Sequence, residues 1–248
     1  GQRRVVALDL SEHVVEAVDE ETQLLAELEI AERVAGTVME DWPVVPVSPI
    51  TGSGLRDLTA AIAAAGIVGP GGAAFPTHVK YTPNDEKPID TVLINGCECE
   101  PFLTPDYRVM LEAPRAVVAG SLLVGRAAGA RTIIIGIENN KPQAIEALRK
   151  AAAGTGIQIA VLKTKYPQGS EKQLIMAVLK RAVPLGGLPL DVGVAVSNVG
   201  TAAAIARAVM RGKPLTHRVV SVTGSGWKPS ARIAAGTGPE ISQVRPPS

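Results

Sequence analysis

The stretch DTVLINGCECEP, from Asp90 to Pro101, decides the fold. Its first half is a short apolar run, which is typical of a strand buried on both faces of a sheet. Its second half places one amide and two carboxylates directly after that strand, on Asn95, Glu98 and Glu100. Further apolar runs that we interpret as strands lie at residues 3–10, 44–48, 131–138, 156–164, 191–198 and 218–224.

Helical segments alternate with these strands along the chain. We predict helices at residues 12–34, 52–66, 114–130, 140–153, 170–181 and 201–212. Gly66 ends the second of them, and Pro142 stands near the start of the fourth. Such alternation predicts an α/β fold with a mostly parallel sheet and helices on both faces. Ligands of these folds bind at the carboxyl ends of the strands.

Composition excludes several classes of protein. The chain has 248 residues, 46% of them hydrophobic, and a formal net charge of +1, so no basic surface for nucleic acid is indicated. No apolar run reaches the roughly 18 residues that a membrane span needs. Cys97 and Cys99 are too close in sequence for an unstrained disulfide, and with three scattered histidines they do not form a closed metal site. We therefore expect a reducing compartment and no bound metal.

A glycine-rich loop, GIVGPGGAAFPTHVK, occupies residues 66–80. Glycine lets a ligand approach the main chain closely. Gly69 and Gly71 can be aligned with the G-x-G-x-x-A dinucleotide fingerprint, but that motif should follow a strand, and here a predicted helix precedes it. We favour a cradle of backbone N–H groups, with Phe75 stacking on a ring and Lys80 neutralising a phosphate. A plain glycine-rich turn is the alternative.

The polar residues after Asp90–Gly96 allow three interpretations. Glu98 and Glu100 are two residues apart, so in an extended segment their side chains point to the same side. Such a pair can bind ribose hydroxyls or a nicotinamide amide, act as general acid and base, or form a solvated acidic turn. Asn95 can donate to a ring carbonyl.

Two helix starts carry further candidate residues. Gly169, Glu171 and Lys172 begin one helix, where free N–H groups bind anions, although Glu171 can equally serve to satisfy the helix dipole. Asn198 and Thr201 flank the start of the next helix, where a capping role is the alternative to a binding role.

These motifs occur together, in this order, in one known family. Between residues 65 and 236 the chain resembles the C subunit of the Rnf electron transport complex, a relative of the NADH-binding flavoprotein subunit of respiratory complex I. The segments that carry the resemblance are GIVGPGGAAFPTHVK, INGCECEPFLTPDYRVMLE, GIENNKPQAI, KYPQGSEKQLI, VSNVGTAAAI and RVVSVTG. The resemblance implies a complex I flavoprotein-like nucleotide-binding domain in a subunit that passes electrons from NADH toward iron–sulfur clusters. It also implies a peripheral position on the cytoplasmic face of the bacterial plasma membrane, with other membrane subunits as partners and ferredoxin as an indirect one.

The resemblance further implies binding sites for FMN and NADH. Gly69, Gly71 and Gly72 are expected to lie against the nucleotides, and Phe75 to stack on nicotinamide or adenine. The residues expected to line the flavin pocket are Lys80, Asn95, Glu98, Gly169, Glu171, Asn198 and Thr201. Glu100 and Lys172 are candidates for the NADH side. Since the flavin carries the chemistry, no catalytic acid or base of the protein is expected.

The chain departs from that family at several points. Cys97 stands where the family has alanine, and the ligands of the family's [4Fe–4S] clusters are absent from this sequence. Residues 1–62 resemble instead the end of the GTPase domain of the selenocysteine-specific elongation factor, through SPITG and GLRDL. We therefore divide the chain into a partial GTPase-like α/β segment (1–64), an FMN- and NADH-binding domain (65–224) and a linker or truncated module (225–248), joined as a fusion or chimera.

Two other functions fit the motifs. The related cobalamin reductase of bacterial microcompartments shares the glycine-rich loop and the acidic motif, and reduction of cob(III)alamin would identify it. A degenerate scaffold would keep the fold without filling the pocket, and absence of flavin binding would identify it.

The N-terminal resemblance generates a prediction. The sequence contains no G-x-x-x-x-G-K-[ST] loop, so nothing cradles the phosphates of a guanine nucleotide. We predict that the full chain does not bind a fluorescent GTP analogue in a polarisation titration. A micromolar Kd would contradict this.

Overall fold

The computed structural model describes residues 6–9, 44–47, 55–69, 74–82, 86–98, 100–216 and 218–221. Of these, residues 6–9, 44–47 and 55–57 are described by their backbone alone. The predicted helix at 12–34, Gly71, Gly72, Cys99 and residues 222–248 lie outside the described residues. The division of the chain into three parts stays a prediction.

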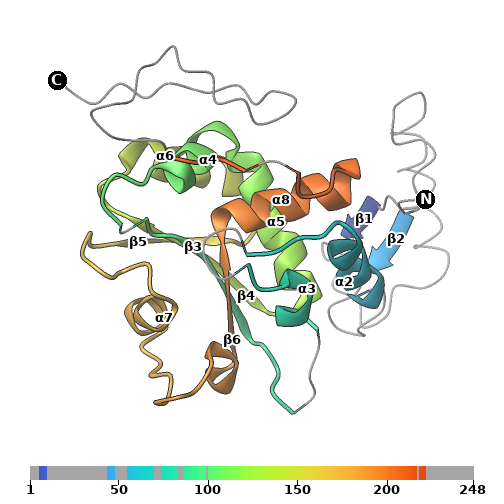
Figure 1. The fold of residues 1–248 in the computed structure, drawn as a ribbon, viewed down its shortest axis with the longest axis horizontal. Helices are drawn as coiled ribbons and strands as arrows, with labels where there is room; N and C mark the ends of the chain where they lie inside the picture. The colour runs from blue at the N-terminus through green and yellow to red at the C-terminus, as the bar shows by residue number, and fades with distance from the viewer. Residues whose placement is uncertain are drawn as a thin grey trace.

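A parallel four-stranded sheet forms the centre of the molecule (Figure 1). Its order is β5 (Gln158–Leu162), β4 (Thr132–Glu138), β3 (Thr91–Gly96) and β6 (Val194–Asn198). Thr91 of β3 lies opposite Thr132 of β4 and Val194 of β6, so the three strands run in step to the same edge. The predicted α/β class with a mostly parallel sheet is confirmed. β1 (Val6–Asp9) and β2 (Val44–Val47) form a separate parallel pair.

Helices cover both faces of the sheet, as predicted (Figure 1). One face carries α4 (Pro105–Glu112), α5 (Pro114–Ala127), α6 (Pro142–Ala152) and α8 (Val199–Arg211), and α2 (Leu55–Ala64) packs against α5 and α8. The other face carries α7 (Glu171–Leu179) and the short 3-10 helix η1 (Pro189–Val192). Val92 and Ile94 of β3 belong to the first core and Leu93 to the second. Successive side chains of a strand point to opposite faces, so one apolar strand supplies both cores.

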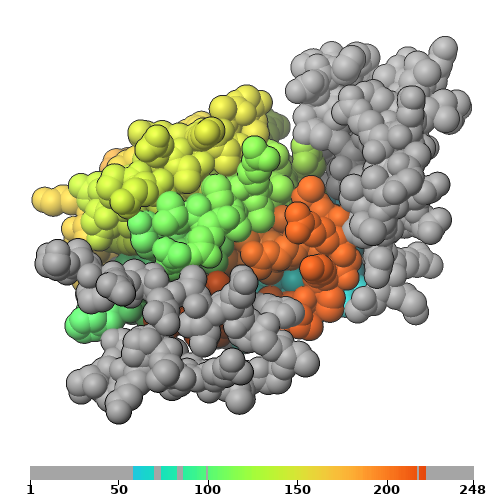
Figure 2. All heavy atoms as spheres, turned by 90° about the horizontal axis from the view of Figure 1, so that it is seen from above, coloured from blue at the N-terminus to red at the C-terminus, as the bar shows by residue number. Residues whose placement is uncertain are grey.

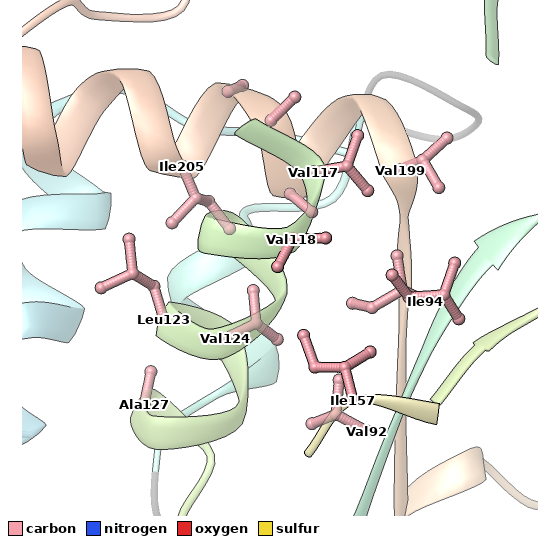
Figure 3. Close-up of a cluster of buried hydrophobic side chains, with 14 of the residues drawn as sticks. Val92, Ile94, Val117, Val118, Leu123, Val124, Ala127, Ile157, Val199 and Ile205 are labelled. Carbon is pink, nitrogen blue, oxygen red and sulfur yellow. The ribbon is translucent and has the colours of Figure 1, made fainter. Parts of the chain in front are cut away.

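α5 and α8 pack against each other in the larger core. The apolar residues of α5 lie between Val199 and Ile205 of α8 and Val92 and Ile94 of β3 (Figure 3). α4 packs against α6 on one side and α8 on the other, and these three helices lie across the surface seen in Figure 2. None of the helices that the structure describes is long and apolar enough to cross a bilayer.

Three elements differ from the sequence prediction. α4 (Pro105–Glu112) was not predicted, although Thr104 at its N-cap, Pro105 at its first position and Asp106 in its first turn are local signals of a helix start. The short helix α3 (Thr77–Lys80) was also missed within the glycine-rich loop. The predicted strand at 218–224 is wrong for Arg218–Ser221, which form no strand. Val219 and Val220 in this segment are exposed. β-branched residues favour a strand only where they pack against neighbouring strands, so their presence alone does not produce one.

The close approach of α5 to α8 generates a stability prediction. A Cβ atom added at Gly120 would overlap the backbone carbonyl of Ala202. We expect Gly120→Ala to lower the free energy of unfolding by about 1–3 kcal/mol or more in urea denaturation, because backbone cannot move aside as a side chain can. Gly125→Ala is the control on the same helix, since its Cβ meets side-chain atoms of Ile133, Cγ1 and Cδ1, rather than backbone. Equal stability of the two variants would contradict this packing.

Candidate functional site

A cleft of about 500 Å³ opens where β3 and β6 end. Asn95 of β3 lies opposite Asn198 of β6 in the sheet register, and we name this space the Asn95–Asn198 cleft. Eight residues predicted from the sequence line it: Gly69, Phe75, Lys80, Asn95, Gly169, Glu171, Asn198 and Thr201. Segments far apart in sequence therefore meet at the carboxyl edge of the sheet, where α/β folds bind ligands.

Asn95 ties the end of β3 to the segment that precedes α7. Its Nδ2 donates to the carbonyl oxygen of Gly169 at 2.7 Å. Its Oδ1 accepts from the backbone N–H of Cys97 at 3.0 Å. Both polar ends of the side chain are thus engaged, and this fixes the position of the α7 N-terminus relative to the sheet.

Lys80 brings a positive charge to the cleft from the end of α3. Its Nζ lies 3.0 Å from Glu171 Oε1 and donates to the carbonyl oxygen of Val196 at 3.3 Å. The Lys80 and Glu171 side chains are 36% and 46% exposed, and such a pair contributes about 0–1 kcal/mol. An anionic ligand can therefore replace Glu171 as the partner of the Lys80 ammonium with little loss of free energy. The ring of Phe75, which is 46% exposed, also lines this cleft.

Two helix N-termini face the Asn95–Asn198 cleft. Ser170 and Glu171 stand at the start of α7, and Asn198 and Thr201 at the start of α8. Asn198 caps α8, since its Oδ1 accepts from the N–H of Gly200 at 2.8 Å. The N–H groups and dipoles of helix starts attract anions.

Three buried hydroxyl groups in the lining have no hydrogen-bond partner among the described residues. They belong to Tyr81, Ser197 and Thr201. Burial raises the pKa of the Tyr81 phenol above its usual value, so Tyr81 keeps its proton. A buried hydroxyl without a partner costs free energy. The cleft therefore offers donors and acceptors to a ligand rich in oxygen and nitrogen.

Sequence reasoning missed two of these hydroxyls. Ser197 directly precedes Asn198 and Tyr81 directly follows Lys80. Ser197 could have been found from its place at the end of a strand. Tyr81 gave no such signal, because its burial depends on helices from other parts of the chain.

A second cleft of about 510 Å³ lies next to β3, β4 and β5. Glu98, Glu100, Tyr107, Glu138, Lys141 and Tyr166 are among its lining residues, and we name it the Glu98–Tyr166 cleft. Glu98 lines this second cleft, with Glu100, and not the Asn95–Asn198 cleft that most of the other predicted residues line. Its two carboxylate oxygens accept from the N–H groups of Asp106 at 2.9 Å and Tyr107 at 3.3 Å, so it caps α4.

The remaining predicted residues lie elsewhere. Lys172 lines neither cleft, and its Nζ donates to the carbonyl oxygen of Pro184 at 3.4 Å. Gly71 and Gly72 are outside the described residues. In the part of the chain that the structure describes, no group of three or more His, Cys, Asp or Glu residues is placed to hold a metal ion.

Comparison with known proteins identifies the kind of domain that carries these clefts. Residues 62–207 match the family model described as Complex1_51K, the Nuo51 FMN-binding domain. The chain is 50% identical over 179 residues to the C subunit of the proton-translocating ferredoxin:NAD(+) oxidoreductase complex of Clostridium ljungdahlii, covering 72% of this chain and 39% of that protein. It is 50% identical over 165 residues to the Na(+)-translocating counterpart of Acetobacterium woodii, covering 66% and 37%. The chain thus spans well under half the length of these relatives.

A solved structure agrees with the fold. The crystal structure of an NAD+-reducing [NiFe]-hydrogenase in its air-oxidised state aligns with a TM-score of 0.52 and 26% identity, covering 63% of this chain and 30% of that chain. The resemblance to the Rnf C subunit that the motifs predicted is confirmed by the relatives named above. The likeness of residues 1–62 to an elongation factor stays a prediction.

The unpartnered hydroxyls generate a prediction about the ligand-free protein. Thr201→Val keeps the side-chain shape and removes a buried hydroxyl that bonds to none of the described residues. We expect the free energy of unfolding in urea to stay within about 0.5 kcal/mol or to rise, because a desolvation penalty is removed.

Ser121→Ala is the control for this experiment. The Ser121 hydroxyl donates to the carbonyl oxygen of Val117 at 2.7 Å, and its loss should cost about 0.5–1.5 kcal/mol. A larger loss of stability in Thr201→Val than in Ser121→Ala would show that the Thr201 hydroxyl already has a partner.

Proposed function

The chain belongs to the Nuo51 FMN-binding domain family, and on that premise we propose that it binds FMN in the Asn95–Asn198 cleft and exchanges electrons between NADH and that flavin. In this proposal it is the flavin domain of the C subunit of an Rnf-type ion-translocating oxidoreductase. The observation that carries the proposal is that three unpartnered hydroxyls, two helix N-termini and the Lys80 ammonium meet in one cleft of the described structure. Its volume of about 500 Å³ suits a cofactor-sized ligand.

The lining groups fit each chemical part of FMN. The N-termini of α7 and α8 and Lys80 supply positive potential for a phosphate or for negative charge on a reduced ring. The hydroxyls of Tyr81, Ser197 and Thr201 suit a polyol chain or the heteroatoms of a ring. The exposed face of Phe75 suits stacking on a flat ring.

The protein's part in the reaction is to bind and orient. Bound FMN would supply the chemistry, accepting two electrons as a hydride and releasing them singly. Asn95, held at both ends by hydrogen bonds, keeps the sheet edge and the α7 N-terminus in place. The Lys80 ammonium would leave its ion pair with Glu171 and bind the ligand instead. No protein acid or base is needed, so we assign Glu98 and Glu100 no proton transfer.

NADH is proposed to approach from the side of the Glu98–Tyr166 cleft. Glu100 lines that cleft, together with the highly exposed rings of Phe102 and Tyr166. Carboxylates bind ribose hydroxyls, and aromatic rings stack on nicotinamide or adenine. Lys172 stays a weaker candidate for this site, because it reaches Pro184 rather than either cleft.

Partners and location follow from the same proposal. The relatives are named as subunits of ion-translocating oxidoreductase complexes. We propose that this chain is held by other subunits of such a complex at the cytoplasmic face of the membrane. Electrons would leave the flavin for iron–sulfur clusters, whose ligands we assign to none of the described residues.

Titration of the purified full chain with FMN tests the proposal. Binding is followed by quenching of flavin fluorescence, and NADH is then added anaerobically while the flavin absorbance is recorded. We expect saturable binding followed by bleaching. Lys80→Met should weaken FMN binding by about 10- to 100-fold, because a charge-assisted hydrogen bond is worth about 1.5–3 kcal/mol.

Lys87→Met is the matched control, since Lys87 pairs with Asp191 and does not line the Asn95–Asn198 cleft. It should bind FMN like the wild type. Equal affinities of Lys80→Met and Lys87→Met would place the flavin elsewhere. Binding without bleaching would retain the flavin site and reject the NADH site.

A further inference from the structure

Phe102, in the wall of the Glu98–Tyr166 cleft, has a backbone conformation that phenylalanine rarely adopts. Its φ is +67°, in the left-handed region, where a Cβ atom comes too close to the neighbouring backbone. Most of the positive-φ positions among the described residues are occupied by glycine, which has no Cβ. For a bulky residue such a φ is an outlier, and outliers of this kind gather at ligand sites.

The unusual conformation belongs to a tight turn after β3. The N–H of Leu103 donates to the carbonyl oxygen of Glu100 at 3.4 Å and closes the turn. Pro101 stands at the second position of the turn, and Phe102, with its positive φ, stands at the third. These are the features of a type II turn, whose third residue is normally glycine. A phenylalanine therefore stands where the backbone favours glycine.

A turn in the loop before η1 shows that the chain elsewhere uses glycine at this position. The N–H of Gly187 donates to the carbonyl oxygen of Pro184 at 2.9 Å, and the third residue, Gly186, has a φ of +75°. Phe102 thus carries a conformational strain that is avoided in a comparable turn of the same protein. Its side chain must supply something that glycine cannot.

Packing within the protein does not explain the phenylalanine. Phe102 is 79% exposed, so its ring adds little to the stability of the ligand-free fold. The ring lines the cleft together with that of Tyr166, which is 75% exposed and comes from the loop after β5. Two exposed rings from separate loops offer faces on which a flat ligand ring can stack. Because the turn fixes the Phe102 ring beforehand, less entropy is lost on binding.

The positions of the two clefts indicate which end of a dinucleotide reaches Phe102. The clefts share no lining residue. They are nevertheless neighbours, since Asn95 lines one and Glu98, three positions later, lines the other. Hydride transfer requires the nicotinamide ring to lie against the flavin, which we have placed in the Asn95–Asn198 cleft. The ring left for the Glu98–Tyr166 cleft is then the adenine.

We propose that Phe102 stacks on the adenine ring of NADH and that the strained turn fixes its ring for this purpose. Glu100 begins the same turn, so its carboxylate is available to the hydroxyls of the attached ribose. The inference rests on the proposed function for the position of the nicotinamide end. Recognition of adenine itself needs no flavin, so an adenine mononucleotide binds in the same cleft.

Calorimetric titration of the full chain without FMN, first with AMP and then with nicotinamide mononucleotide, tests the proposal. Phe102→Gly and Phe102→Ala both remove the ring, whereas Phe102→Tyr keeps it. We expect the first two variants to bind AMP about 2- to 12-fold more weakly, which is the contribution of one aromatic stack. Phe102→Tyr should keep the wild-type Kd, and titration with nicotinamide mononucleotide should not distinguish the variants.

Leu185→Ala is the control for removal of an exposed apolar side chain. Leu185 is exposed at the tip of the glycine-containing turn and lines neither the Asn95–Asn198 nor the Glu98–Tyr166 cleft. This variant should bind AMP like the wild type.

Melting temperatures separate the strain of the turn from the binding of the ring. Glycine relaxes the turn, whereas alanine keeps the strained φ. Phe102→Gly should therefore melt about 2–4 °C above Phe102→Ala while binding AMP no more tightly. A purely structural role of the ring would instead lower the melting temperature of both variants and leave AMP binding unchanged.

Wild-type affinity for AMP in Phe102→Gly would overturn the proposal, and so would a wild-type chain that does not bind AMP. Weaker binding of nicotinamide mononucleotide with unchanged binding of AMP would show that the nicotinamide end lies here instead. Failure of the proposed function has a different signature. A chain that binds AMP through Phe102 but does not bind FMN would reject the flavin site and keep the adenine site.

Discussion

Strand β3 pairs with β4 on one side and β6 on the other, and the candidate site depends on that pairing. The register places Asn95 opposite Asn198, so two amides that are far apart in sequence stand at adjacent strand ends. Because the strands are parallel and in step, the loops that follow them all leave from one edge. The glycine-rich loop, the start of α7 and the start of α8 can then meet around one cleft.

Packing on the two faces of the sheet keeps that edge rigid. The larger core lies under α5 and α8 and the smaller one under α7. Gly120 lets α5 approach the backbone of α8 at Ala202 closely, and this brings the α8 N-terminus to a defined place over β3. Side chains at these helix starts are therefore held in defined positions, since regular elements position side chains more precisely than loops do.

Charge is distributed unequally around the two clefts. The Asn95–Asn198 cleft is lined by helix N-termini, hydroxyls and one exposed ion pair, so it attracts negative charge and releases Lys80 readily. The Glu98–Tyr166 cleft is lined by three carboxylates, those of Glu98, Glu100 and Glu138, and of these only Glu138 is buried, beside the buried ammonium of Lys141. The hydrogen bond from Asn198 to Asp106 joins the start of α8 to α4, the helix that Glu98 caps.

The sequence by itself determined the α/β class, most strands and helices, and eight lining residues of the cleft. These depend on local signals: apolar runs of strand length, helical periodicity, and polar residues directly after strands. Local signals for α4 also exist in Thr104, Pro105 and Asp106 and were missed, whereas its capping by Glu98 joins two segments and cannot be read from a local pattern. The sequence also did not separate Glu98 from the residues of the first cleft, and it did not indicate the buried hydroxyls of Tyr81 and Ser197. Only the tertiary structure decided these points, because they rest on burial and on contacts such as Asn95 with Gly169 and Asp106 with Asn198, which join segments that periodicity cannot bring together.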